Sequence, residues 1–391
     1  MAERWRIGLV VPRFGADVYG GAETHARTLA HALAELGHTV DVLTTTARSA
    51  LSWLPRTAPG TAVEDGLVVR RFDPEPRDWT TYGRLLDRLE REGALGPEDA
   101  RALVRAMGRS PALVDYLAAE ADRRDWWLFI PYLFATTLEG IHAVPRAVLV
   151  PCLHDEPLAA LAPVAEAFAA AAAVWYNTPE EAELGLRRFG RPGPVVGIWT
   201  EPAEPDRRIL EDLRARGLPP RYLLYVGRLE HGKGVGELFA WHRVLVEAAD
   251  DAPALVAVGE GPVEPDPDAA VVFRRAPPAV KHALYAGALA LVLPSVRESL
   301  SLVLLEAWQH GLPVLVRAGS PVTTGHVRRS GGGLVVDGPA AFAAAVLALV
   351  RRPRLRAALG AAGRRYVAAR WSPAAVKARL RAALADLAAL S

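Results

Sequence analysis

The sequence predicts an α/β protein of two domains, each with an open parallel β-sheet between layers of helices. Short runs rich in β-branched residues or leucine alternate with longer runs of helical period, which is typical of a parallel sheet covered on both faces. The series of expected strands begins twice, and a length of 391 residues suits two to three domains. A proline-containing stretch, Gly197 to Asp206, separates the two series and is expected to be a short linker.

The first series defines an N-terminal domain, residues 1–200. Its expected strands are Ile7 to Val11, Val40 to Thr44, Val68 to Phe72, Ala147 to Val150 and Val174 to Asn177. Between the first two strands, apolar residues from Ala26 to Leu36 follow helical spacing, and Gly37 supplies a C-terminal stop. The stretch 79–124 is charged and helical in period, so we expect it to insert an extra helical layer into this domain.

The second series defines a C-terminal domain, residues 206–371. Its expected strands are Tyr222 to Val226, Ala254 to Val258, Val271 to Arg274, Leu289 to Leu293, Pro313 to Val316 and Leu334 to Val336. The last segment, residues 372–391, has the pattern of an amphipathic helix with Ser372 as N-cap and Pro373 at its first position. Open α/β sheets bind ligands at the carboxyl ends of their strands, so a cleft between two such domains is the expected place for chemistry.

Composition excludes several classes of protein. Forty-six basic residues against 44 acidic ones give a net charge of +2, which disfavours a nucleic-acid-binding protein. The single cysteine, Cys152, excludes an internal disulfide framework and fits a reducing compartment. The longest apolar stretch, Leu158 to Trp175, is interrupted by Pro163 and Glu166. We therefore expect a cytoplasmic protein with no transmembrane segment; peripheral membrane contact and oligomeric state stay open.

Two glycine-containing segments follow expected strands. Gly20-Gly21-Ala22-Glu23 lies between the first strand and the first helix, where glycines let a ligand approach the backbone and a helix N-terminus attracts an anion. A tight turn explains these glycines equally well. The segment from Gly227 to Gly234 follows the strand at Tyr222, and its Arg228 and Lys233 suit a diphosphate. The chain has three lysines against 43 arginines, so a retained lysine indicates a need for a compact ammonium.

A third motif contains two glutamates eight positions apart. Glu298 and Glu306 follow the strand at Leu289, and a helix beginning near Leu300 would place Glu306 two turns inward. A carboxylate in so apolar a helix is costly unless a partner hydrogen-bonds to it. Sugar or ribose hydroxyls are one such partner. The alternative is an N-capping Glu298 and an ion-paired core Glu306.

His154 comes directly after the strand at Ala147, so we expect it at the edge of the cleft, although a lone histidine is more often structural. Asp266-Pro267-Asp268 has the D-x-D spacing of a metal site but lies in a proline-rich stretch, and we interpret it as a turn. No metal site is predicted.

In this order, the motifs resemble retaining glycosyltransferases of the GT-B fold, specifically family 4. The matching residues are Gly20 to Glu23, Gly37 to Val40, Gly227 to Leu229 with Lys233-Gly234, Val258 to Pro262, Tyr285-Ala286, Pro294-Ser295 and Glu298 to Glu306. Asp125 to Gly140 and Leu153 to Pro157 look like a bacterial and archaeal branch of that family. The resemblance implies two Rossmann-like domains that face each other across a cleft, with the last helix crossing back to the N-terminal domain.

The resemblance also implies roles for individual residues. Arg228 and Lys233 would neutralise the leaving diphosphate, Glu298 would hold the transferred sugar, and His154 would line the reaction centre. The donor-binding residues implied are Gly20, Gly21, Gly227, Arg275, Ser299, Leu300, Ser301, Leu302 and Glu306, with Glu306 on the nucleotide ribose and Arg275 near the base. Candidates on the acceptor side are Glu23, His25, Tyr132, Thr136 and Thr137.

The implied reaction is transfer of a sugar from a nucleotide-diphosphate sugar to a hydroxyl acceptor, with retention of configuration and without a metal ion. Many relatives have Phe and Gly where this chain has Leu300 and Ser301, so the sugar pocket differs and the transferred sugar stays open. The sequence also leaves open whether the acceptor is a glycan, a lipid-linked molecule or a small molecule. Two alternatives are a GT-B sugar-nucleotide epimerase and a catalytically silent subunit that binds nucleotide sugar.

Overall fold

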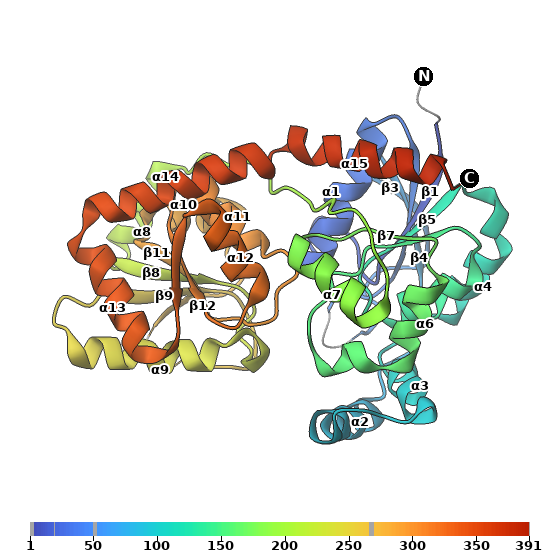
Figure 1. The fold of residues 1–391 in the computed structure, drawn as a ribbon, viewed down its shortest axis with the longest axis horizontal. Coiled ribbons are helices and arrows are strands. Elements are labelled where there is room, and N and C mark those ends of the chain that lie inside the picture. Colours follow the sequence, from blue (N-terminus) through green and yellow to red (C-terminus); the bar gives the residue numbers. More distant parts are fainter. Residues whose placement is uncertain (1–3, 19, 50–52, 266–269, 391) are drawn as a thin grey trace. The chain divides into compact units, whose positions relative to one another are not determined.

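The computed structural model describes residues 4–18, 20–49, 53–265 and 270–390. The chain divides into two compact units (Figure 1). The first contains the residues up to Ile198 together with those from Lys377 onward, and the second contains Trp199 to Val376. Each unit is built on its own sheet with helices packed against it, so the predicted α/β class with two Rossmann-like domains is confirmed. Asp266-Pro267-Asp268 lies outside the described residues.

The sheet of the first unit has the strand order β3-β4-β2-β1-β5-β6-β7. Its strands are β1 (Arg6–Val10), β2 (Thr39–Thr45), β3 (Gly60–Glu64), β4 (Leu67–Phe72), β5 (Trp126–Phe129), β6 (Ala147–Leu149) and β7 (Ala173–Val174). Neighbouring strands are parallel, except that β3 runs antiparallel to β4 at the edge. The sequence analysis did not predict β3 or β5, so the expectation of a purely parallel sheet was wrong at this edge. Strand β1 lies between β2 and β5, where the strand order reverses.

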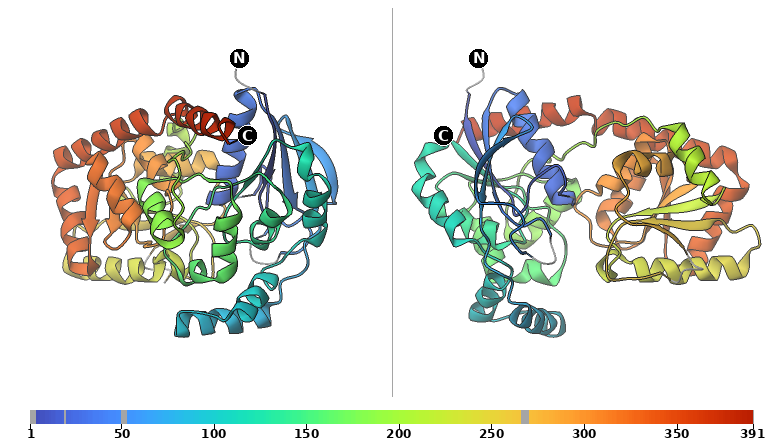
Figure 2. Two further views of the ribbon diagram at one scale, coloured as in Figure 1. Left: turned by 45° about the vertical axis from the view of Figure 1, so that its right-hand side comes forward. Right: turned by 180° about the vertical axis from the view of Figure 1, so that it is seen from behind.

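Helices surround this sheet. They are α1 (Gly21–Glu35), α2 (Trp79–Glu92), α3 (Pro97–Arg105), α4 (Pro111–Ala119), α5 (Ala135–Leu138), α6 (Ala162–Ala170) and α7 (Pro179–Phe189). The stretch 79–124 forms α2, α3, α4 and a short 3-10 turn, and Figure 2 shows part of it at one end of the unit. Leu85, Leu103 and Leu117 from these helices are buried in one apolar cluster with Trp127 and Phe129 of β5. The insertion is therefore part of this unit's core.

The second unit has a fully parallel sheet with the strand order β10-β9-β8-β11-β12-β13. Its strands are β8 (Tyr222–Val226), β9 (Ala254–Val258), β10 (Val271–Phe273), β11 (Ala290–Leu293), β12 (Val314–Arg317) and β13 (Gly333–Val336). Its helices are α8 (Arg207–Ala215), α9 (Val235–Ala248), α10 (Pro278–Gly287), α11 (Leu302–Gln309), α12 (Pro321–Ser330), α13 (Gly338–Arg351) and α14 (Pro353–Arg370). The order reverses at β8 and β11, so ligands are expected at the carboxyl ends of these two strands.

The last helix, α15 (Pro373–Ala388), begins at the expected cap, because the Ser372 hydroxyl accepts a hydrogen bond of 3.4 Å from the Ala375 N–H. From Lys377 onward it belongs to the first unit. There Lys377 pairs with Glu35, and the Arg379 Nε donates to the Val196 carbonyl at 2.9 Å. Among the described residues, no helix combines the length and the apolar character that crossing a membrane requires.

Candidate active site

The loop after β8 is fixed by backbone hydrogen bonds to the loop after β9. Gly227 N donates to Val258 O at 3.0 Å, and Leu229 N donates to Glu260 O at 2.8 Å. A Cβ on Gly259 would lie 1.9 Å from the Gly227 carbonyl oxygen, so only glycine permits this approach. The position of the Arg228 loop is thus determined by backbone packing at a site where the sequence supplies a glycine.

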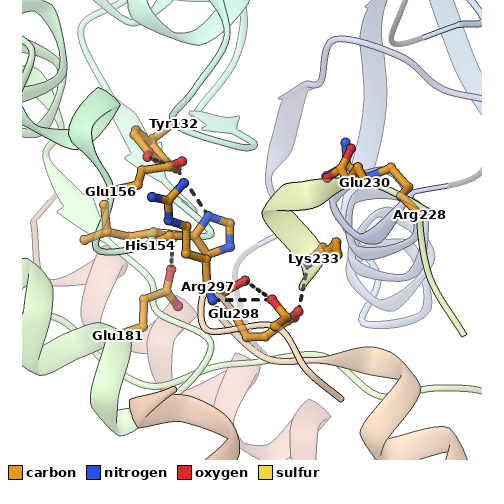
Figure 3. A network of polar contacts seen from close by, with 11 residues as sticks. Tyr132, His154, Glu156, Glu181, Arg228, Glu230, Lys233, Arg297 and Glu298 are labelled. Atoms are coloured by element: carbon orange, nitrogen blue, oxygen red, sulfur yellow. Dashed lines mark hydrogen bonds and ion pairs between the residues drawn. The ribbon is translucent and has the colours of Figure 1, made fainter. Parts of the chain in front are cut away.

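Lys233 ends a 3-10 turn directly before α9. Gly234, which follows it, has a φ of +71°, and a Cβ there would lie 2.6 Å from the Pro294 carbonyl oxygen. This glycine therefore lets the loop after β8 contact the loop after β11. Across that contact the Lys233 Nζ donates to the Glu298 Oε1 at 2.8 Å (Figure 3). The structure thus brings together two of the four predicted catalytic residues at the point where the strand order reverses.

Arg228 and Arg275 lie at the surface of the same unit. Arg228 is 67% exposed and pairs with Glu230 at 3.0 Å. Arg275 is 84% exposed, has a φ of +48°, and donates from Nε to the Glu260 Oε1 at 2.7 Å. Both guanidinium groups can reorient, because exposed ion pairs of this kind contribute little stability.

The helix that follows Glu298 begins later than expected. Helix α11 starts at Leu302, not near Leu300, because Ser301 has a left-handed φ of +68° and ends the preceding loop. Glu298, Ser299 and Leu300 therefore belong to the loop. The Ser301 hydroxyl is buried and has no hydrogen-bond partner.

Glu306 lies on α11 between buried apolar neighbours, and 13% of its side chain is exposed. Lys281 Nζ donates to its Oε1 at 2.8 Å, and the Tyr285 hydroxyl donates to its Oε2 at 2.9 Å. Both donors come from α10, and the sequence analysis singled out neither as a partner of Glu306. The hydrogen-bonding requirement of the buried carboxylate is thus met within the protein.

In the first unit, the paired glycines lie where α1 begins, after the loop that follows β1. Gly20 is the N-cap, and a Cβ there would meet the Glu23 carboxylate at 2.0 Å. Glu23 is 6% exposed and ion-paired with Arg13. A Cβ on Gly21 would meet no atom within 4 Å, so packing within the protein does not explain that glycine.

His154 follows β6 in a loop that contacts the loop after β5. Its Nδ1 lies 3.4 Å from the Glu156 Oε1, which also accepts the Tyr132 hydroxyl hydrogen bond at 2.5 Å (Figure 3). The Tyr132 N–H donates to the Pro151 carbonyl at 2.9 Å, joining the two loops. Because a carboxylate only accepts, this contact favours the proton on His154 Nδ1 and leaves Nε2 as an acceptor.

The predicted acceptor-side residues are buried. Tyr132, Thr136 and Thr137 are at most 1% exposed, and the hydroxyls of both threonines have no hydrogen-bond partner. His25 is 4% exposed, and burial lowers its pKa to about 4. Its Nδ1 lies 3.7 Å from the Cys152 Sγ. Contact of these side chains with an acceptor stays a prediction.

Glu181, which the sequence analysis missed, anchors the His154 loop. It lies in the first turn of α7 and is 1% exposed. Its two oxygens accept the backbone N–H groups of Leu153 and Asn177. Burial raises its pKa to about 8, although the two N–H donors act in the opposite direction. The sequence carried one signal, the helix-start pattern Thr178-Pro179-Glu180-Glu181.

Two models of known protein families match this chain. A model described as glycosyl transferases group 1 matches residues 220–352, and one described as glycosyltransferase family 4 matches residues 19–124. Between them they cover more than half of the chain, including both glycine segments and both glutamates. The chain belongs to glycosyltransferase family 4. Its α/β units are those of the GT-B fold, and the enzyme is a glycosyltransferase, as the motifs predicted.

Named relatives agree with this assignment. This glycosyltransferase is 29% identical to D-inositol 3-phosphate glycosyltransferase 1 of Catenulispora acidiphila, over 92% of this chain and 89% of that one. Sucrose-phosphate synthase from Thermosynechococcus elongatus has a similar structure, with a TM-score of 0.74 at 20% identity, covering 99% of this chain and 100% of that one. HepE from Anabaena, solved in complex with UDP, gives a TM-score of 0.66 at 13% identity over 97% and 100% of the two chains.

Proposed function

We propose that this glycosyltransferase transfers a sugar from a UDP-sugar to a hydroxyl acceptor, with retention of configuration and with protein cations in place of a metal ion. The observation that carries the proposal is the Lys233–Glu298 pair, 2.8 Å apart, at the carboxyl ends of β8 and β11. A cation for the diphosphate and a carboxylate for sugar hydroxyls thus lie side by side where the strand order reverses.

The cations would act on the leaving group. Negative charge develops on the diphosphate as its bond to the sugar breaks, and preorganised positive groups stabilise that charge. Lys233 is 24% exposed, so its ammonium can be reached by a phosphate while Glu298 turns to the sugar. Arg228, which is 67% exposed, supplies a second cation from the same loop. Arg275 is a candidate for contacting the base from the neighbouring loop.

The first unit carries two elements that suit a substrate. The N-terminus of α1 presents backbone N–H groups beside Gly21, which has open space where a side chain would project. His154, oriented by Glu156, would line the reaction centre with Nε2 as a hydrogen-bond acceptor for a substrate hydroxyl. Carboxylate partners commonly fix the tautomer of a functional histidine in this way.

Named relatives guide the choice of substrates to test. HepE, which shares the fold, was solved with UDP, and this makes UDP the first nucleotide to examine. Relatives that match about nine-tenths of this chain are named D-inositol 3-phosphate glycosyltransferases, so D-inositol 3-phosphate is the first acceptor to examine.

Calorimetric titration with UDP, GDP, ADP and dTDP in the presence of a chelator tests the donor site. We expect selective UDP binding that is weakened in Lys233→Ala. The matched control is Lys377→Ala, because Lys377 is 23% exposed and also pairs with a glutamate, Glu35, which lies at the opposite end of α1 from Gly21. Binding of another nucleotide would change the donor assignment, and UDP binding only after addition of a divalent metal would refute metal independence.

Turnover tests the reaction itself. Incubation with a UDP-sugar and D-inositol 3-phosphate, followed by NMR of the product, shows whether transfer occurs and whether the anomeric configuration is retained. We expect Lys233→Ala to reduce kcat by about 10² to 10³, as for loss of one preorganised donor. Epimerised donor in the absence of acceptor would instead favour an epimerase.

A further inference from the structure

We infer that Lys281 and Tyr285 are positioning residues that fix the carboxylate of Glu306 for recognition of the nucleotide ribose. The inference rests on the proposed donor site and extends it to two residues on α10. Glu306 receives one hydrogen bond on each oxygen, from Lys281 at 2.8 Å and from Tyr285 at 2.9 Å.

The first argument is the scarcity of lysine. The chain has three lysines among 46 basic residues, and each is ion-paired with a glutamate. Two of these glutamates are Glu298 and Glu306, the two ends of the E-x7-E motif. In a chain that otherwise uses arginine, lysine at these two places indicates that a compact ammonium with one short contact is needed, not a planar fork.

The second argument is the geometry at Glu306. A carboxylate has about four acceptor positions, and the two donors from α10 occupy one on each oxygen. Each oxygen therefore keeps an acceptor position for a further donor. The 2'- and 3'-hydroxyls of a ribose are a pair of adjacent donors of the kind that fits two such oxygens. Since 13% of the Glu306 side chain is exposed, a ligand can reach it.

The third argument is that Tyr285 is itself held in place. Its ring is stacked on the His310 ring, with centroids 5.5 Å apart and planes 10° apart. His310 Nε2 lies 2.9 Å from His282 Nδ1, so these two side chains are hydrogen-bonded as well. A fixed tyrosine fixes the plane of the carboxylate that it contacts, and this plane decides whether both ribose hydroxyls can bind.

Stability alone does not account for this arrangement. Buried and half-buried ion pairs are weak stabilisers, because desolvation offsets most of the attraction, and an apolar residue would suit the environment of α11. The buried neighbours of Glu306 on α11 include Leu304, Leu305 and Trp308. A carboxylate and its ammonium partner in this apolar place therefore point to a ligand function.

The test compares binding of UDP with binding of 2'-deoxy-UDP by calorimetry. Wild type should prefer UDP, and Glu306→Gln should lose most of that preference. Lys281→Ala and Tyr285→Phe should each weaken UDP binding about tenfold, the lower range for a hydrogen bond to a charged group, and leave 2'-deoxy-UDP nearly unchanged. Lys281→Arg should not restore the preference. Lys377→Ala, with nearly the same exposed fraction and an ion pair in the other unit, should behave as wild type.

The outcomes separate the two proposals. If wild type binds no nucleotide, the donor site is wrong and this inference falls with it. If Glu306→Gln loses the preference for UDP while Lys281→Ala and Tyr285→Phe both keep it, the donor site stands and this inference is wrong. Should Lys281→Ala fail to fold, as judged by circular dichroism, Tyr285→Phe decides, because it removes one hydroxyl and retains the stacked ring. Equal weakening of both nucleotides would also overturn the inference, because that result indicates a general disturbance of the site.

Discussion

Replacing Glu181 with glutamine should release the loop that carries His154. One glutamate oxygen accepts the Leu153 N–H and the other accepts the Asn177 N–H, both in a fully buried place. Glutamine has one accepting oxygen, and its NH₂ group would face the other N–H donor. Above pH 8, where the Glu181 carboxylate is charged, the loss is one hydrogen bond to a charged group, about 1.5–3 kcal/mol, with a buried N–H left unpaired. This free energy corresponds to about a 10- to 150-fold increase in opening of the loop.

The chain's single thiol reports this opening. Cys152 directly precedes Leu153, and its Sγ contacts His25 and Asn177, so a loop that opens exposes it to a thiol reagent such as DTNB. At a pH above 8, where Glu181 is ionised, we expect Glu181→Gln to react at least tenfold faster than wild type, with Glu180→Gln on the same helix as the control. The sign of the pH dependence follows from the pKa of Glu181, raised from 4.5 to about 8. Wild type loses stability as pH rises from about 4.5 to 8, because the unfolded chain releases this proton first, whereas the glutamine variant does not titrate. Unchanged DTNB kinetics and an unchanged urea midpoint would refute this account of the loop.

Three further predictions follow from the structure. Ser301→Gly should stabilise the second unit by about 1 kcal/mol, measured as a higher thermal midpoint, because it relieves a left-handed φ of +68° and removes a buried hydroxyl without a partner. Gly259→Ala should weaken UDP binding in calorimetry, because its Cβ would lie 1.9 Å from the Gly227 carbonyl and displace the Arg228 loop; normal affinity would contradict this role. Acid should destabilise the protein between pH 6.5 and 4, because burial lowers the pKa of His25 to about 4 and that of His326 to about 3, so the unfolded chain takes up protons that the folded chain rejects. Each contributes up to about 1.4 kcal/mol per pH unit, and urea titrations at pH 7 and pH 5 measure the sum.

Most of the fold could be predicted because parallel strands in a three-layered α/β domain are buried on both faces and appear as apolar runs. The two missed strands lack that signal. Strand β3, with sequence Gly60-Thr-Ala-Val-Glu64, is an exposed edge strand that pairs only with β4, so neither face selects for apolar residues. Strand β5, Trp126–Phe129, is fully buried, but it is short and aromatic and directly follows the helical insertion.

The candidate site could be predicted only as far as residue type and strand-end position allow. Lys233 and Glu298 each follow an expected strand, so a strand-end position could be predicted for both, whereas their contact depends on β8 and β11 being neighbours in the sheet. The contacts of Glu156 with Tyr132 and His154 depend on how two loops fold over each other, which local sequence does not determine. The left-handed Ser301 is a similar case, because serine gives no sign of a positive φ where glycine would.

Glu298 and Glu306, the two ends of the E-x7-E motif, form ion pairs of similar length and exposure. The two pairs differ in the elements that they join. Lys233–Glu298 and Lys281–Glu306 have the same length, 2.8 Å, and nearly the same exposed fractions, 24% and 13% against 25% and 13%. The first joins two loops, so it can open when a phosphate competes for the lysine. The second joins helices α10 and α11, where backbone hydrogen bonds oppose any opening. We therefore expect a bound donor to rearrange the first pair and to leave the second pair in place.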